Sequence, residues 1–457
     1  MLLPPDNSGP LYLNLYRQLR AQIETGERRA GEKLPSKRAV ASQLGISVNT
    51  VDAAYGQLLS EGFVEARPRS GFYVQPIGQL QRLPMPPVEQ TVPVARHDGV
   101  KVDFAPGDVS REKFPFTVWN RLLKNALDDP LSLRRAEPQG DAGLRQAVAS
   151  YLHAARGVNC QSEQIVIGAG TDSLLSLLSF LLPSNCAAAV ENPVYNKAYR
   201  FFERMGHPVL PAEIDRQGVM VEPLENLTDV LLYTTPSHQY PLGLSMPMGR
   251  RVALLNWAGR GNSRFILEDD YDSEFRYDAK PVPSLQSIDE NGRTIYLGTF
   301  SRSVAPSVRV SYLVLPPALL DLYRREYAGF ACAVSTLEQI ALREFLLQGH
   351  FETHLNRMRV CYRAKRARLL DGLAPLDGQI RCIGEAAGCH LTLQARNGLN
   401  ESELCRRALD AGVRVYPISP FFMGACPYDG KVLLGFGGLS DGQLDEGTSA
   451  LCRAWHV

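Results

Sequence analysis

The sequence lacks the features that would place the chain in a membrane, in a disulfide framework or around a zinc ion. It has no apolar run of about 18 residues and no basic start followed by an apolar stretch, so a cytoplasmic protein without membrane contact is expected. Its nine cysteines are scattered without CxxC or Cys/His spacing, which favours reduced thiols. No metal is implied.

The chain also lacks an excess of charge of either sign. It carries 49 Lys and Arg against 48 Asp and Glu, a net charge of +1, so any surface that binds nucleic acid must be local. The length of 457 residues, 45% of them hydrophobic, predicts two or three globular domains with a large core.

Three short helices are predicted near the N-terminus. Apolar residues recur every four positions from Leu11, which indicates an amphipathic helix that ends near Gly26. Ser36 is placed to cap a second helix, and Gly45 is placed to end it with a left-handed backbone. Ser47 then starts a third helix.

Two short strands, 63–66 and 71–74, follow the third helix. Helix, tight turn, helix and hairpin form the layout of a winged helix-turn-helix, in which the helix after the turn enters the major groove. We expect residues 1–75 to form this DNA-binding domain, although residues 1–74 carry only nine basic against seven acidic residues. The proposed contacts to operator DNA are Lys37, Arg38 and Arg69 for the backbone, and Ser47, Asn49 and Thr50 for base edges or phosphates.

A change of composition separates this domain from the rest of the chain. Residues 76–100 contain five prolines and no apolar period, which is typical of an extended linker. Residues 101–457 then alternate apolar strands with amphipathic helices, and this predicts an α/β domain around a mostly parallel sheet. The clearest predicted strands are 164–167, 187–190, 230–233, 265–268 and 294–297.

Each of these strands ends at a polar cluster, and ligands of open α/β sheets bind at the carboxyl ends of strands. The glycine-rich turn 168–173 favours an anion at a helix N-terminus, although tight turns need glycine on steric grounds alone. Tyr195 could face a planar ligand or pack as core. The acids of 267–272 are hard to accommodate structurally, and metal binding is one interpretation. Hydroxyls and two arginines follow in 298–309. Together the clusters indicate a pocket for a phosphorylated heterocycle with a protonated ring nitrogen, namely pyridoxal phosphate.

Seven short motifs stand out along the chain: 31–38 and 44–51 in the first domain, and 140–145, 156–158, 236–241, 268–275 and 433–436 in the second. They resemble motifs of the MocR subfamily of GntR-type bacterial transcription regulators, and the match spans nearly the whole chain. The resemblance implies a fold-type I aminotransferase-like domain that senses pyridoxal phosphate, sometimes with an amino compound, and a head-to-tail homodimer.

The resemblance also implies a role for each pocket residue. The phosphate would be bound by Gly170, Thr171, Asp172, Thr299, Ser301 and Arg309. Tyr195 would stack on the pyridine ring, Asp269 would pair with its protonated nitrogen, and Tyr271 would hydrogen-bond the 3′ oxygen. Arg302 occupies the position of the lysine that binds the cofactor covalently in such domains.

Arg302 removes the expected covalent chemistry. Its guanidinium stays protonated at physiological pH and is a poor nucleophile, so neither a Schiff base nor catalysis is expected. Non-covalent binding of pyridoxal phosphate is favoured; the alternative is that Arg302 fills the site and pairs with Asp269 or Asp270. Lys197 and Leu433 stand where related proteins have arginines, which favours a simple vitamer over an amino compound.

The sequence therefore predicts a transcription regulator that senses pyridoxal 5′-phosphate, with vitamin B6 genes as hypothetical targets. One alternative is an aminotransferase with an appended DNA-binding domain, which Arg302 opposes. Another is a regulator whose large domain is only a ligand-free dimerisation scaffold.

Overall fold

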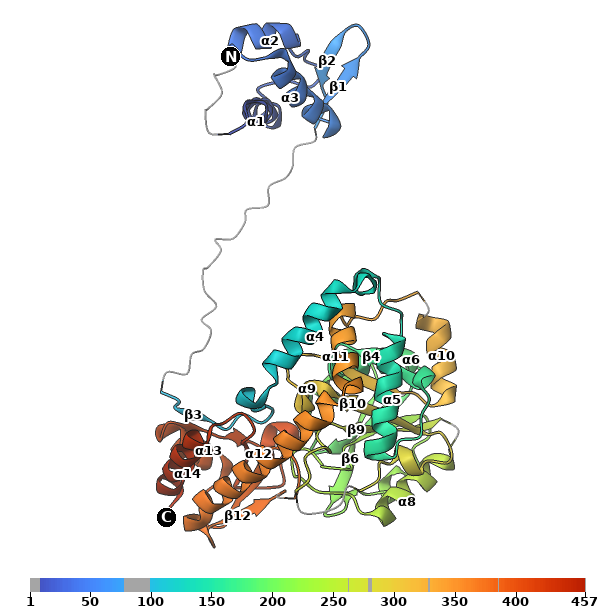
Figure 1. Ribbon diagram of the computed structural model, residues 1–457, viewed down its shortest axis with the longest axis vertical. Coiled ribbons are helices and arrows are strands. Elements are labelled where there is room, and N and C mark those ends of the chain that lie inside the picture. The colour runs from blue at the N-terminus through green and yellow to red at the C-terminus, as the bar shows by residue number, and fades with distance from the viewer. Residues whose placement is uncertain are drawn as a thin grey trace. The chain divides into compact units, whose positions relative to one another are not determined.

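The computed structural model describes residues 9–77, 99–261, 263–277, 282–327, 329–384 and 386–456. The chain divides into two compact units, residues 1–96 and 97–457 (Figure 1), which are described separately. Most of the linker expected over 76–100 lies outside the described residues. In the described part of the chain, no helix is both long and apolar enough to cross a membrane.

The first unit is a winged helix-turn-helix, as predicted. The Ser36 side chain accepts a hydrogen bond from the Ala39 N–H, and Gly45 ends the second helix at φ 67°. Ser47 caps the third helix by accepting from the Thr50 N–H. The elements are α1 (Leu11–Glu24), α2 (Lys37–Leu44), α3 (Val48–Ser60), β1 (Val64–Arg67) and β2 (Gly71–Val74).

The apolar faces of these three helices form one small core. Leu19, Val40, Val51 and Leu58 are fully buried in it, and the Tyr55 hydroxyl donates to the Pro35 carbonyl at 2.9 Å. The buried phenol therefore satisfies its polar group on the loop that precedes α2.

The second unit is built around an eight-stranded sheet, ordered β4-β11-β10-β9-β8-β5-β6-β7. The run from β10 through β9, β8 and β5 to β6 is parallel, and β11 and β7 lie antiparallel to it. β4 pairs antiparallel with β11 and so runs in the same direction as the parallel strands. All five predicted strands are present. The strands are β4 (Ile165–Gly168), β5 (Ala187–Asn192), β6 (Val209–Asp215), β7 (Gly218–Val219), β8 (Val230–Thr234), β9 (Arg264–Asp270), β10 (Thr294–Thr299) and β11 (Ser311–Val314).

Helices cover both faces of this sheet, as the nearly continuous apolar strands require. Leu144 and Leu152 share one apolar core with Ile167, whereas Leu178 shares a second core with Leu231. The helices are α4 (Phe116–Asp128), α5 (Ala142–Arg156), α6 (Thr171–Leu181), α7 (Asn196–Arg204), α8 (Met248–Gly259), α9 (Phe300–Ser303), α10 (Pro317–Tyr327) and α11 (Thr336–Leu347).

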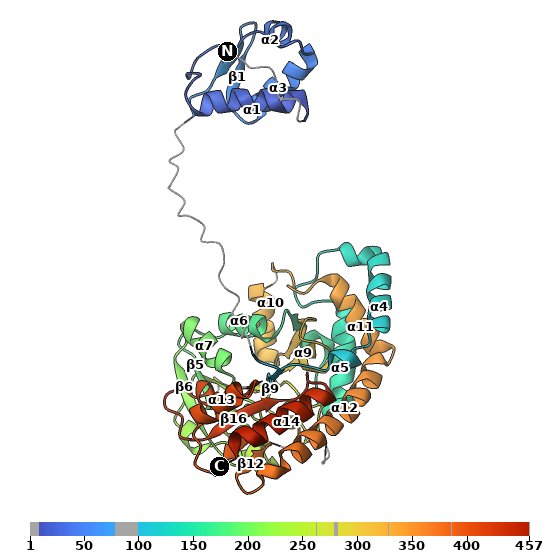
Figure 2. The same cartoon turned by 90° about the vertical axis from the view of Figure 1, so that its left-hand side faces the viewer.

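The long helix α12 (His350–Leu373) leads to a smaller C-terminal part of the same unit. This part has an antiparallel sheet, ordered β12-β13-β16-β15, and a short parallel pair of β14 with β3. Figure 2 shows β12, α13 and α14 grouped together, away from α10. The remaining elements are β3 (Val102–Asp103), β12 (Ile380–Ile383), β13 (His390–Ala395), α13 (Glu401–Asp410), β14 (Val413–Arg414), β15 (Tyr416–Pro417), β16 (Lys431–Gly435) and α14 (Asp441–Trp455).

Two glycines of the first unit should respond oppositely to alanine. Gly45→Ala places a side chain at a left-handed position and is expected to lower the free energy of unfolding by about 1 kcal/mol. Gly56→Ala, an exposed mid-helix position with open space around the new Cβ, is expected to raise it by roughly 0.5–1 kcal/mol. Calorimetry of the full chain measures both, and equal shifts of one sign would contradict the expectation.

Candidate ligand-binding site

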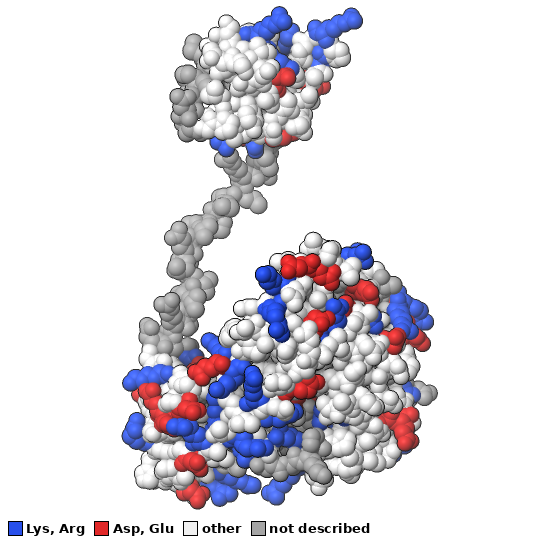
Figure 3. Space-filling model, in the orientation of Figure 1, with Lys and Arg blue, Asp and Glu red and all other residues white. Residues whose placement is uncertain are grey.

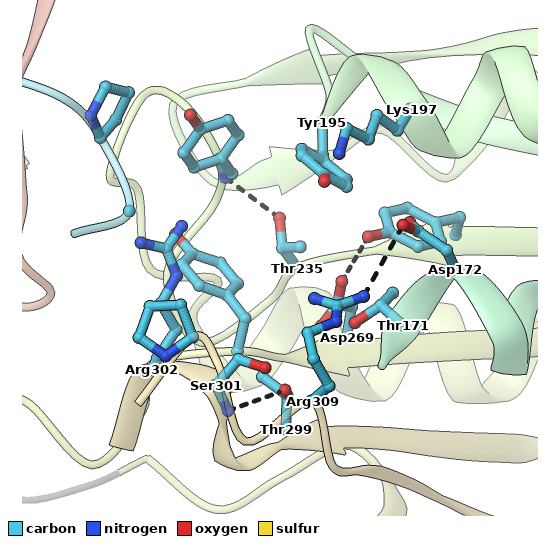
Figure 4. A pocket seen from close by; sticks show the side chains of 16 residues that line it. Thr171, Asp172, Tyr195, Lys197, Thr235, Asp269, Thr299, Ser301, Arg302 and Arg309 are labelled. Atoms are coloured by element: carbon cyan, nitrogen blue, oxygen red, sulfur yellow. Dashed lines mark hydrogen bonds and ion pairs between the residues drawn. The ribbon is translucent and has the colours of Figure 1, made fainter. Parts of the chain in front are cut away.

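A cavity of about 390 Å³ opens at the carboxyl ends of β4, β5, β8, β9 and β10 (Figure 4). Its volume lies within the range of roughly 300–1,000 Å³ that is usual for small-molecule sites. Nine of the ten ligand residues expected from the sequence line it; the tenth, Gly170, precedes Thr171 as the N-cap of α6. The lining residues are Pro106, Gly107, Thr171, Asp172, Tyr195, Lys197, Tyr233, Thr235, Tyr240, Asp269, Tyr271, Thr299, Ser301, Arg302, Pro306 and Arg309.

One end of the cavity is suited to an anion. The free N–H groups of α6 begin after Gly170, and a Cβ at that glycine would lie 2.3 Å from Nη2 of Arg309. Arg309 has an uncommon positive φ of 51° and lies 3.9 Å from Asp172. The buried Ser301 hydroxyl has no hydrogen-bond partner among the described residues. Helix N–H groups, a guanidinium and an unused hydroxyl are what a phosphate would require.

Asp269 lies in the middle of the cavity, at the end of β9. Its carboxylate accepts a hydrogen bond from the Tyr233 hydroxyl. The pKa of Asp269 is raised to about 7, chiefly by burial and also by the nearby Asp270 and Asp272, against the lowering effects of Tyr233 and Arg302. A cationic group of a ligand, such as a protonated pyridine nitrogen, would supply the charge that favours ionised Asp269.

The structure accommodates Glu268 and Asp270 by giving each one different partners. Asp270 binds the Arg156 guanidinium at 2.8 Å and the Tyr296 hydroxyl at 2.6 Å. Glu268 accepts from two backbone N–H groups, at 2.8 and 3.0 Å. Successive residues of a strand face opposite sides of the sheet, so these carboxylates point away from Asp269.

Two aromatic side chains bound the rest of the cavity. Tyr195 lies on the β5 side, with its ring centroid 6.2 Å from that of Tyr240 and 5.9 Å from Nζ of Lys197. The Tyr271 hydroxyl donates to the His238 carbonyl at 2.9 Å, and burial raises the pKa of this phenol strongly. Both rings border the space that a planar ligand would occupy, and Tyr271 stays protonated there.

Arg302 lies at the other end of the cavity, on α9. Its guanidinium packs against Gly107, where a Cβ would lie only 2.8 Å from Nη1. Within the described residues no hydrogen bond or ion pair to Arg302 is found, and Asp270 pairs with Arg156 instead. The alternative in which Arg302 closes the site by pairing with Asp269 or Asp270 is therefore not the observed arrangement.

A buried group of two imidazoles and a carboxylate lies beside Arg302. Nδ1 of His238 is 2.9 Å from Asp272, and the rings of His238 and His390 lie 4.8 Å apart at 36°. The three ligand atoms come within 4.8 Å of one another. In this structure the group is held together by the contact between His238 and Asp272, with the His390 ring tilted against that of His238.

Sequence reasoning missed three of the groups that shape the cavity. Tyr233 looked like one more core residue of β8, and nothing in the sequence near Gly107 or His390 linked them to the strand-end clusters. Tyr233 binds Asp269, Gly107 packs against Arg302 and His390 borders the same end. Only a tyrosine at the end of an otherwise aliphatic strand offered a local signal.

The residues proposed to contact DNA belong to the start of α2, the start of α3 and the tip of the hairpin. Arg38, Ser47 and Asn49 are exposed, and Arg69 sits at the tip of the hairpin with φ 61°. Lys37 is already engaged, since it forms an ion pair with Asp52 and its Nζ lies 4.9 Å from the Phe72 ring centroid. In Figure 3, Lys and Arg side chains project from the side that carries α2 and the hairpin in Figure 1.

Comparison with known proteins agrees with both units. Residues 11–74 match the bacterial regulatory proteins of the gntR family, and residues 100–451 match aminotransferase class I and II. The fold of the large unit resembles that of the multiple substrate aminotransferase from Thermococcus profundus (TM-score 0.70, 23% identity, 78% of this chain and 91% of that chain). An archaeal alanine:glyoxylate aminotransferase is similar at 26% identity (TM-score 0.70, 79% and 92%).

The fold and the cavity define a winged-helix DNA-binding unit joined to a fold-type I aminotransferase-like unit, a fold that binds pyridoxal phosphate. Curated relatives share this organisation along their whole length. The chain is 38% identical to the uncharacterized HTH-type transcriptional regulator YdeL of Bacillus subtilis (98% of this chain, 97% of that protein) and 33% identical to the probable rhizopine catabolism regulatory protein MocR of Rhizobium meliloti (100% and 96%). It is 30% identical to the HTH-type pyridoxine biosynthesis transcriptional regulator PdxR of Corynebacterium glutamicum (95% and 94%). The chain belongs to the MocR subfamily of GntR-type transcription regulators.

Removing one partner of the buried Arg156–Asp270 pair should strongly destabilise the second unit. Arg156→Met leaves a buried carboxylate without its cation and is expected to lower the free energy of unfolding by about 3–5 kcal/mol. Calorimetry of the full chain measures the loss. The matched control is Arg406→Met, which breaks an exposed pair with Asp410 and should cost less than about 1 kcal/mol. Similar losses in both variants would contradict the expectation.

Asp269 should make the ligand-free protein less stable as the pH rises. Its pKa is raised to about 7 in the folded chain, above the usual value near 4, so the folded state holds a proton that the unfolded state has lost. Stability from this group is then present at low pH and is lost between about pH 4 and 7.

Asp269→Asn removes this titration, so its melting temperature relative to wild type should rise from pH 5 to pH 8. Scanning calorimetry without ligand measures the difference. Asp128→Asn, at an exposed position of α4, is the matched control and should follow the wild-type profile. Parallel profiles for wild type and Asp269→Asn would contradict the assignment.

Proposed function

We propose that this regulator binds pyridoxal 5′-phosphate reversibly in its large unit and that binding changes its affinity for operator DNA. The observation that carries the proposal is the pocket itself. The buried Ser301 hydroxyl without a partner, the α6 N-terminus and Arg309 suit a phosphate, and Asp269 suits a protonated ring nitrogen. When bound, the cofactor would supply an aldehyde that accepts hydrogen bonds in a site with no lysine at position 302.

In this proposal the cavity residues bind and orient but do not catalyse. Thr171, Ser301 and Arg309 hold the phosphate, with Gly170, Asp172 and Thr299 shaping its cup. Tyr195 covers one face of the ring, and the Tyr271 hydroxyl hydrogen-bonds the 3′ oxygen. Arg302 cannot release a proton to act as nucleophile or base, so the unit acts as a receptor and not as an aminotransferase.

The proposed organisation assigns operator contacts to residues 1–75 and effector binding and dimerisation to residues 101–457. The dimer would be head-to-tail, as the resemblance to MocR proteins implies. The relative PdxR is described as a pyridoxine biosynthesis regulator, which supports vitamin B6 genes as targets. Arg38, Asn49, Thr50 and Arg69 are exposed or partly exposed and would contact DNA together with Lys37 and Ser47, the second of which also caps α3.

A direct test measures cofactor binding and DNA binding in the same preparation. An operator is first selected from random duplex DNA by the full-length protein, and its affinity is then measured with and without saturating pyridoxal phosphate. The expected change is roughly 5- to 150-fold, equivalent to about 1–3 kcal/mol of coupling. Unchanged affinity at saturation would favour the scaffold alternative.

Borohydride reduction separates a receptor from an enzyme. Wild-type protein is expected to bind pyridoxal phosphate with a change in absorbance, to lose it on dialysis and to yield no reduced adduct at residue 302. Arg302→Lys supplies the missing amine and is the matched positive control, expected to yield a reducible adduct. Steady turnover of an amino donor by wild-type protein would revive the aminotransferase alternative.

A further inference from the structure

We infer that the ligand preferred by this pocket carries a carboxylate at the end that faces Arg302, in addition to a phosphate at the Arg309 end. The chemical class is a phosphorylated pyridine carboxylate, either with the acid on the ring, as in pyridoxic acid 5′-phosphate, or on an amino acid joined to the ring. The inference rests on the proposed function, because it takes the pocket to hold a pyridoxal-type ring.

The first observation is that the cavity has two cationic ends. In Figure 4 the guanidinium of Arg309 lies beside Thr171 and Asp172, whereas that of Arg302 lies on the opposite side of the cavity. The phosphate-binding groups, including the unpaired Ser301 hydroxyl and the α6 N-terminus, serve the Arg309 end. A ligand that fills the cavity with its phosphate at that end must present a different group to Arg302.

The second observation is that the Arg302 guanidinium is held in place. A Cβ on Gly107 would lie 2.8 Å from Nη1 and 3.3 Å from both Cζ and Nη2, so the group packs against bare backbone. The φ of Gly107 is +127°, a conformation that other residues rarely adopt. Because this side of the guanidinium is fixed by packing, less entropy is lost when its N–H groups bind a ligand.

The third observation is the charge balance of the lining. Its cations are Lys197, Arg302 and Arg309, and its acids are Asp172 and Asp269. Asp172 lies 3.9 Å from Arg309, and Asp269 binds Tyr233. Asp272 also lies near Arg302, in the neighbouring small pocket, but it binds His238. Within the described residues Arg302 therefore forms no direct ion pair, because the carboxylates near it already have other partners, and a partly buried cation without such a pair is costly.

A carboxylate neutralises the charge of Arg302 better than the other groups found on such a ring. It accepts two parallel N–H···O bonds from a guanidinium and neutralises its charge. An aldehyde oxygen accepts a hydrogen bond without supplying charge, and an ammonium group would be repelled. The order of affinity expected for ligands that differ only at this position is carboxylate, then aldehyde, then amine.

The neighbouring strand offers no other receptor for such a group. Leu433 of β16 is fully buried among Tyr240, Leu242, Ile418 and Phe422. Among the described residues, Arg302 is therefore the cation that would contact the ligand at the end of the cavity opposite Arg309.

Calorimetric titration of the full-length protein tests the inference with four compounds. These are pyridoxal 5′-phosphate, pyridoxamine 5′-phosphate, pyridoxic acid 5′-phosphate and N-(5′-phosphopyridoxyl)-L-alanine. In wild type at least one carboxylate compound should bind about 10- to 100-fold more tightly than pyridoxamine phosphate. Preference for the ring acid or for the alanine adduct identifies which of the two carboxylate sources the site accepts.

Variants tie this preference to Arg302. Arg302→Gln should reduce it to less than about threefold, while Arg216→Gln, at an exposed position outside the cavity, should keep it in full. Arg302→Lys keeps a charge without the planar fork and should give an intermediate preference between the ring acid and pyridoxamine phosphate. It serves as the second variant if Arg302→Gln does not fold.

The outcomes separate this inference from the proposed function. If pyridoxal phosphate and pyridoxamine phosphate bind as tightly as both carboxylates, the inference is overturned and the receptor function stands. A carboxylate preference that survives in Arg302→Gln also overturns it. If none of the four compounds binds wild-type protein, the proposed function fails and the inference fails with it.

Discussion

Parallel hydrogen bonding between β8, β9 and β10 is the constraint on which the cavity depends. The register pairs Tyr233 with Leu267 and Asp269 with Leu297, so the ends of the three strands meet at one edge of the sheet. Side chains alternate between the two faces with a period of two residues, and a slip of one residue would exchange Asp269 for Asp270 at the cavity. Both faces are covered by apolar helices, so such a slip would also bury charges without partners. The burial of the sheet therefore fixes which acid faces the ligand.

The same register explains why adjacent acids can coexist at a buried strand end. Asp270 faces the side where α5 supplies Arg156, and Glu268 accepts backbone N–H groups with Arg251 3.8 Å away. Asp269 has only a neutral phenol, because its face is the cavity. Its charge is thus left to be balanced by whatever binds there, and burial keeps its pKa near 7 until that happens. A buried acid without a cation costs stability, and in the proposed function this cost would be offset when a cationic ring nitrogen binds to Asp269.

Local signals made much of this arrangement predictable from the sequence. Helix caps and left-handed turns depend on one or two residues, so Ser36, Gly45 and Ser47 could be assigned correctly, and five buried strands could be recognised by their apolar runs and polar ends. Groups that come into contact only through tertiary packing could not be predicted from the sequence. Gly107 reaches Arg302 across nearly two hundred residues, and Tyr233 resembles core because strands buried on both faces show no alternation. The acids of 267–272 also looked unfavourable from the sequence, because the groups that bind them come from other segments of the chain.

The replacement at residue 302 leaves this framework intact, because neither the sheet register nor the phosphate end depends on that side chain. What it changes is the charge that a ligand meets. Lysine at this position can become neutral by bonding to a carbonyl carbon, whereas arginine keeps its full charge and its planar donors in every bound state. In the proposed receptor, a site with an arginine at each end and one ring-facing acid would favour a ligand with two anionic groups and a protonated nitrogen. Arg302 would then replace covalent capture by selection through charge and geometry, and binding would stay reversible, as the sensor of a regulator requires.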